Sequence, residues 1–220
     1  METLEIFADA SLRNIDNRVF TCSGALCPNT HEEKYVITQD STNNRGELLA
    51  VYLAVCMAAR TRDMYPERFK DINIYSDSQF VVFGLTKWMA SWLNHRDDKG
   101  VLYGSSGFPV KNQEMFMMII TYCVINKLVI HFYHQKGHVN TASPKELASA
   151  NNVFRISNGH LLNPEDIFKI SFYNDIVDKN SRFMLQNINP NEYPMVKQYK
   201  HNKKIMCKYV IPSDYTRFVQ

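Results

Sequence analysis

Three short runs rich in apolar residues lie in the first forty residues of the chain. These runs cover residues 4–8, 18–26 and 34–38, and polar turns separate them. Short apolar runs bounded by polar turns are typical of strands. Because successive strands joined by short turns usually pair antiparallel, the pattern predicts an antiparallel meander of three strands.

The pattern then changes to that of a helix. From Arg45 to Arg60 the apolar residues fall on one helical face, and the preceding Asn43-Asn44 pair suits a helix start. The remaining predicted elements are a strand (72–76), two short helices interrupted near Gly84 (78–85 and 87–93), a polar loop (94–108), a helix (112–126) and a strand (128–133). This order predicts an α/β fold whose five-stranded mixed sheet has three antiparallel strands plus two parallel strands and is flanked by helices.

The periodic pattern weakens after about Ser157. Residues 158–220 contain the pairs Asn163-Pro164 and Asn189-Pro190 and short aromatic segments. We therefore predict a domain over residues 1–157 and a C-terminal extension of unknown role over residues 158–220. The extension either packs on the domain or stands apart from it.

Composition limits the classes of protein to which the chain can belong. Of its 220 residues, 45% are hydrophobic, which is ordinary for a globular core, and the formal net charge of +3 permits a polyanionic partner without requiring one. No apolar run approaches the roughly 18 residues of a membrane span, and Glu2 and Glu5 argue against a secretory signal. Five scattered cysteines without a CxxC pair favour reduced thiols, so we expect a cytoplasmic protein.

Three acidic residues occupy positions that an α/β fold brings together. Asp9 follows the first predicted strand, Asp77 follows the fourth, and Glu47 lies in the first turns of the long helix. Carboxylate oxygens are the ligands that Mg²⁺ prefers. The sequence therefore predicts a metal site formed by Asp9, Glu47 and Asp77.

Four short motifs in this order resemble ribonuclease H type 1. They are Phe7-Ala8-Asp9-Ala10-Ser11, Thr42-Asn43-Asn44-Arg45-Gly46-Glu47-Leu48, Tyr75-Ser76-Asp77-Ser78-Gln79 and Gln135-Lys136-Gly137-His138. The resemblance extends from about residue 4 to residue 157. It implies a ribonuclease H-like fold and a metal-dependent endonuclease that hydrolyses the RNA strand of RNA–DNA hybrids, leaving 5′-phosphate and 3′-hydroxyl ends.

The resemblance also implies two bound ions, Mg²⁺ or alternatively Mn²⁺. Asp9 would bridge both ions, Glu47 and Asp77 would hold one, and a fourth residue would support the other. Where the family has an aspartate in its last helix, this chain has Ser149-Ala150-Asn151-Asn152, so the resemblance assigns the fourth position to Asn151. Glu146 and Asn152 are the alternatives. An amide oxygen binds a hard cation without supplying charge, which would weaken the second ion.

The resemblance gives His138 the role of moving protons or helping product to leave, which suits an imidazole that titrates near neutrality. The alternative is a solvated loop histidine. His134 continues the last strand, so we expect a structural role for it.

Other residues would contact the substrate, again by resemblance. The side-chain amides of Asn43, Asn44 and Gln79 would contact base edges and 2′-hydroxyl groups in the minor groove. Ser11 and Asn14 would contact the backbone of the nucleic acid. A basic segment with Trp88, Lys87 and Lys111 would hold the DNA strand. Three structural roles compete with these readings: a helix cap for Asn43 and Asn44, a turn residue at Ser11, and core packing for the Trp88–Trp92 pair.

The lysine- and tyrosine-rich end of the chain could extend the contact with nucleic acid, although a solvated surface is the default for such a segment. From residue 191 to residue 220 it carries Lys197, Lys200, Lys203, Lys204, Lys208 and Arg217.

Two kinds of related nuclease fit the sequence less well. Transposases with this fold place their glutamate late, on a helix after both aspartates, and proofreading exonucleases have an Asp-x-Glu where this chain has Asp9-Ala10-Ser11. A catalytically silent module that binds RNA–DNA hybrids remains an alternative, because the fourth carboxylate is missing from its expected place. In either case we expect a monomer whose partner is an RNA–DNA hybrid.

Overall fold

The computed structural model describes residues 1–39 and 42–192. Its strands form one mixed sheet in the order β3-β2-β1-β4-β5. β1 pairs antiparallel with β2, as does β2 with β3, whereas β4 lies parallel to both β1 and β5. The strands are β1 (Glu2–Ile15), β2 (Arg18–Cys27), β3 (Glu32–Gln39), β4 (Phe69–Ser76) and β5 (His131–His134). The predicted mixed sheet of five strands is confirmed.

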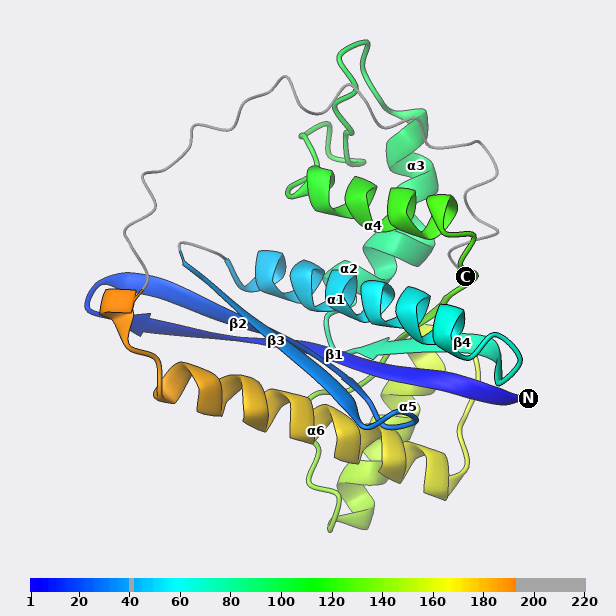
Figure 1. Cartoon of the computed structure of the whole chain (residues 1–220). Coiled ribbons are helices and arrows are strands. Elements are labelled where there is room, and N and C mark those ends of the chain that lie inside the picture. Colours follow the sequence, from blue (N-terminus) through cyan, green and yellow to red (C-terminus); the bar gives the residue numbers. More distant parts are fainter. Residues whose placement is uncertain (40–41, 193–220) are drawn as a thin grey trace.

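Helices cover both faces of this sheet (Figure 1). On one face, α1 packs against Leu4, Ile6 and Ala8 of β1, and the next three helices extend the same core. The helices of this layer are α1 (Asn43–Met64), α2 (Gln79–Phe83), α3 (Met89–Asn94) and α4 (Gln113–Ile125). The predicted interruption near Gly84 is a single π-helical segment, η1 (Gly84–Trp88), which joins α2 to α3.

The opposite face is covered by two helices from the C-terminal part of the chain, α5 (Pro144–Asn158) and α6 (Pro164–Gln186) (Figure 1). Phe7 of β1 and Tyr75 of β4 stack on each other at 5.0 Å between ring centroids. Ile170 and Val177 of α6 belong to the same buried cluster. α6 therefore contributes to the core of the domain.

The sequence pattern did not predict α6, although the signals of its start are present. The Asn163 side chain accepts a hydrogen bond from the Asp166 amide at 2.8 Å, and Pro164 occupies the first helical turn together with the acidic Glu165 and Asp166. Proline and acidic residues are favoured there. The Asn163-Pro164 pair thus begins a helix of 23 residues. A short 3₁₀ turn, η2 (Pro190–Glu192), follows.

Two further expectations concern membrane insertion and thiols. Within the described ranges, no helix combines the length and the apolar character that a membrane span requires. Cys22, Cys27, Cys56 and Cys123 are free thiols, whereas Cys207 and the basic residues from Lys197 onwards lie outside the described residues.

Candidate metal centre

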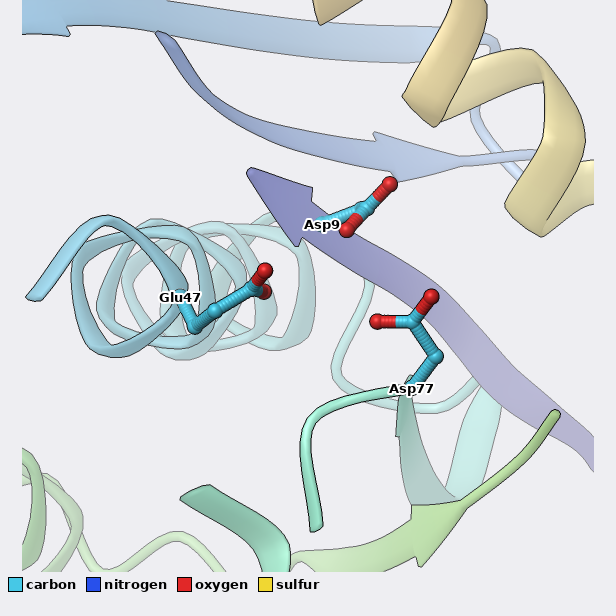
Figure 2. Close-up of side chains that lie close together, drawn as sticks. All are labelled: Asp9, Glu47 and Asp77. Carbon is cyan, nitrogen blue, oxygen red and sulfur yellow. The ribbon is translucent and has the colours of Figure 1, made fainter. Parts of the chain in front are cut away.

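Three carboxylates from three separate elements meet at one edge of the sheet. Asp9 lies on β1, Asp77 directly follows the adjacent β4, and Glu47 is in the first turns of α1. Each residue offers a carboxylate oxygen, and these oxygens all lie within 4.8 Å of one another. Figure 2 shows the side chains pointing toward one another. The structure thus brings together the residues that were predicted to form the metal site.

This acidic cluster is electrostatically unfavourable without a cation. Asp9 and Glu47 are each only 4% exposed. Burial raises the pKa of both carboxyl groups well above its usual range, and the charge of Asp77 raises them further. Glu47 Oε2 is buried and has no hydrogen-bond partner among the described residues. An all-oxygen donor set with an unpaired buried oxygen fits a hard divalent cation such as Mg²⁺ or Mn²⁺.

A fourth carboxylate, Asp178, reaches the same cleft from α6. It is 6% exposed, and its charge raises the pKa values of Asp9, Glu47 and Asp77. The cleft has a volume of about 470 Å³ and is lined by Asp9, Ala10, Ser11, Leu12, Asn43, Glu47, Asp77, Ser78, His138, Asp178 and Arg182.

The structure corrects the prediction for Asn151. Its side chain lies on α5 and is fully used by the backbone of Leu162, since Nδ2 donates to the Leu162 carbonyl at 2.8 Å and Oδ1 accepts from the Leu162 amide at 3.0 Å. The two alternatives are also engaged elsewhere. Glu146 Oε2 accepts from the Asn140 amide, and Asn152 Oδ1 accepts from Arg155. None of these three residues lines the cleft.

A helical pattern on α6 could have revealed Asp178. Asn174, Asp178 and Arg182 follow one another at intervals of four residues, the spacing that places side chains on one helical face. This spacing is informative only once the segment is known to be a helix, which the sequence pattern did not predict. Asp178 also lies far beyond the four motifs in the sequence.

The Asp77 side chain is held from two directions. A hydrogen bond from Asn174 of α6 favours its charged form and opposes the rise in pKa that burial causes. Asn174 Oδ1 in turn accepts from Gln135 Nε2 at 2.7 Å. Behind the backbone, His134 is buried, with Nε2 3.2 Å from the Asp77 carbonyl oxygen and Nδ1 2.8 Å from Ser157 Oγ. These contacts agree with the structural role predicted for His134.

Gly137 packs directly against the side chain of Asp77. A Cβ atom at residue 137 would lie 2.1 Å from Asp77 Oδ2, a distance that forces one of the two groups to move. We expect Gly137→Ala to displace the carboxylate and to lower the activity proposed below for this site by roughly 10- to 100-fold while the protein remains folded. The control is Gly104→Ala, where the nearest atom would lie 3.8 Å from the new Cβ. Equal activity of Gly137→Ala and wild type would show that the position of Asp77 is not critical.

The structure brings some of the predicted substrate-binding residues to the cleft and not others. Ser11, Asn43 and His138 line it. Asn14, Asn44 and Gln79 are exposed but do not line the cleft. The cap of α1 is Thr42, whose side chain accepts from the Arg45 amide, and this corrects the expectation that Asn43 or Asn44 caps the helix.

The residues predicted to hold the DNA strand lie in different surroundings. Lys87 Nζ donates to the Ser157 carbonyl at 2.8 Å and lies 3.9 Å from the centroid of the Phe83 ring, so its charge is engaged in holding η1 against the end of α5. Trp92 is buried, whereas Trp88 remains partly exposed beside it. Lys111 is exposed, just before α4.

The model of the RNase H family matches residues 1–152. The chain belongs to the RNase H family. Ribonuclease HI of Haemophilus influenzae is 32% identical over 140 residues, a match that covers 61% of this chain and 78% of that protein. Ribonuclease H of Neorickettsia sennetsu is 36% identical over 80 residues, which is 36% of this chain and 45% of that protein. For the latter and four Rickettsia relatives, the match spans between 45% and 64% of their length.

Matches among solved structures include an RNase H1 and a viral protease-reverse transcriptase. LC11-RNase H1 has a TM-score of 0.43 at 17% identity, with 71% of this chain and 96% of that chain covered. A foamy viral protease-reverse transcriptase in complex with double-stranded DNA has a TM-score of 0.48 at 14% identity, with 71% and 95% covered. The match to the RNase H family confirms the resemblance that the four motifs indicated.

Proposed function

We propose that this protein is a metal-dependent endonuclease that hydrolyses the RNA strand of RNA–DNA hybrids and leaves 5′-phosphate and 3′-hydroxyl ends. One observation carries the proposal. In a chain of the RNase H family, three carboxylates from β1, α1 and β4 converge within 4.8 Å, and an oxygen of Glu47 has no partner among the described residues. Such a cluster is expected where divalent cations neutralise the repulsion between carboxylates.

The residues that would hold the ions follow from the arrangement of the cleft. Asp9, Glu47 and Asp77 would hold one Mg²⁺ or Mn²⁺ ion, and Asp9 with Asp178 would hold a second. When bound, such ions lower the pKa of a water molecule and neutralise charge on the scissile phosphate. In this proposal Asp178 would take the place that Asn151 was predicted to fill.

The other residues of the cleft would orient the substrate and move protons. His138 Nδ1 lies 3.3 Å from Asp178 Oδ2 and 3.2 Å from a guanidinium nitrogen of Arg182, which leaves Nε2 to exchange protons with the cleft. Asn43 and Ser11 line the cleft and offer neutral hydrogen-bonding groups to the nucleic acid. We propose that the protein acts as a monomer.

The alternative, a silent module that binds hybrids, rested on the missing fourth carboxylate. Because Asp178 supplies a carboxylate to the same cleft, that support is gone. The alternative becomes one outcome of the assay below.

A cleavage assay with a panel of substrates tests the proposal. Purified protein is incubated with an RNA–DNA hybrid, duplex RNA and duplex DNA, each labelled at the 5′ end, in the presence of Mg²⁺, Mn²⁺ or EDTA. We expect cleavage only of the RNA strand of the hybrid, only with metal, and with 3′-hydroxyl ends that a polymerase can extend. Binding of the hybrid without cleavage in either metal would decide for the silent module.

A pair of variants tests the assignment of Asp178. We expect Asp178→Asn to lower hybrid cleavage by roughly 100-fold in Mg²⁺, because the amide keeps the shape of the side chain but removes a negative charge from the cleft. Asn151→Ala loses two hydrogen bonds to the backbone of Leu162 and should lower thermal stability while retaining most of its activity. The reverse ranking of the two activities would restore Asn151 as the fourth ligand.

A further inference from the structure

The cleft contains its own positive charge. Among the described residues that line it, Arg182 is the one whose side chain is permanently cationic. It projects from the same face of α6 as Asp178, one helical turn further on, and its side chain is about half exposed. The guanidinium therefore sits at the boundary between the buried carboxylates and solvent.

Arg182 contacts Asp178 and not the other three carboxylates. Its guanidinium lies 2.8 Å from Asp178 Oδ2, and the other oxygen, Oδ1, lies 3.4 Å from the Ser11 hydroxyl. Glu47 Oε2, by contrast, has no partner in the described part of the chain. Glu47 therefore has no cationic side chain in contact with its buried oxygen, whereas the charge of Asp178 is already neutralised by Arg182.

We propose that Arg182 is an internal counter-cation that competes with the second divalent ion for Asp178. The inference rests on the proposed function, because it concerns the same metal centre. Arg182 and His138 act on Asp9 and Asp77 through their charges alone, and within the described residues their ion pairs are with Asp178. An ion at Asp9, Glu47 and Asp77 therefore displaces no side chain and binds first. An ion at Asp178 binds only when the guanidinium withdraws, so it binds second and more weakly.

The ion pair is suited to such an exchange. The arginine end of the pair is half exposed, so the guanidinium can move into water, whereas the Asp178 side chain is only 8% exposed and needs another cation in its place. A divalent ion carries twice the charge and restores the neutralisation of Asp178 once the arginine leaves. Arg182 is accordingly a positioning residue that sets the metal concentration at which the centre fills.

Binding of Mn²⁺ to the metal-free protein, without nucleic acid, tests this proposal directly. Free Mn²⁺ is followed by electron paramagnetic resonance, and heats of binding by calorimetry, for the full chain and for five variants. We expect two steps for wild type. Arg182→Gln should tighten the weaker step by roughly tenfold and leave the stronger step nearly unchanged. Arg182→Lys should lie between the two, and Asp178→Asn should lose the weaker step.

The control is Lys179→Gln, which removes the same charge from α6 but breaks an exposed pair with Asp175, outside the cleft. Its two steps should match those of wild type. If the weaker step has the same affinity in Arg182→Gln as in wild type, the competition does not exist, whatever the function of the cleft. If wild type binds no Mn²⁺, or if binding persists unchanged in Asp9→Asn, the metal centre itself is wrong and the proposed function falls with it.

Discussion

Asp9→Asn should abolish cleavage of an RNA–DNA hybrid, with a loss on the order of 10³-fold or more at saturating Mg²⁺. Asparagine keeps the shape of the side chain, but it removes one charge from the cluster that Asp9 forms with Glu47 and Asp77. Rates of cleavage under single-turnover conditions measure the loss. The matched control is Asp175→Asn, which removes an exposed carboxylate from α6 and should leave the rate unchanged.

The same variant should be more stable than wild type when both are free of metal. Because burial and neighbouring charges raise the pKa of Asp9 in the folded state, the folded protein retains a proton that the unfolded chain loses above about pH 4. Wild type therefore loses stability relative to Asp9→Asn as the pH rises above this value, and the difference vanishes below it.

Thermal unfolding in EDTA between pH 4 and 8 measures this difference, and Mg²⁺ should reverse it by stabilising only wild type. A variant that keeps full turnover, or that unfolds at a lower temperature than wild type throughout this range, would refute the role assigned to Asp9.

Truncation after Asn158 should leave a chain that does not fold. It removes α6, whose Ile167, Ile170 and Val177 are buried against Phe7 and Tyr75 of the sheet. Burial of one such aliphatic side chain contributes about 1.5–3 kcal/mol, so several of them approach the entire stability of a domain, about 5–15 kcal/mol. The truncation also deletes Asp178. Far-ultraviolet circular dichroism and the soluble fraction after expression measure the effect.

Truncation after Glu192 is the informative counterpart. It keeps every described element, including α6 and η2, and removes only residues 193–220. We expect a soluble, cooperatively folding protein that still cleaves the hybrid. Comparison of hybrid binding by this variant and by the full chain then tests whether the lysine-rich end contributes to the contact with nucleic acid. A soluble and active chain ending at Asn158 would show instead that α6 is an accessory.

Local patterns in the sequence were sufficient for much of the fold and for three of the four carboxylates of the candidate metal centre. Short apolar runs bounded by polar turns predicted β1 to β3, a helical period predicted α1, and the polar residues that end β1 and β4 predicted where Asp9 and Asp77 lie. These inferences succeed because strand ends and helix starts are local features, and because adjacent strands of one sheet must end near each other. The motif around Glu47 then placed a third carboxylate beside them.

Only the tertiary structure decided which residue completes the cleft. Asn151 and Asp178 both lie on helices after β5, and their sequences do not say which helix faces the acidic cluster. The answer depends on the packing of α6 across β1 and β2, which brings Asp178 and Arg182 to residues more than 160 positions earlier in the chain. Such long-range contacts depend on the shape of the apolar surfaces that meet, which no local period encodes. For the same reason Lys87, predicted to face the nucleic acid, instead ties η1 to the end of α5.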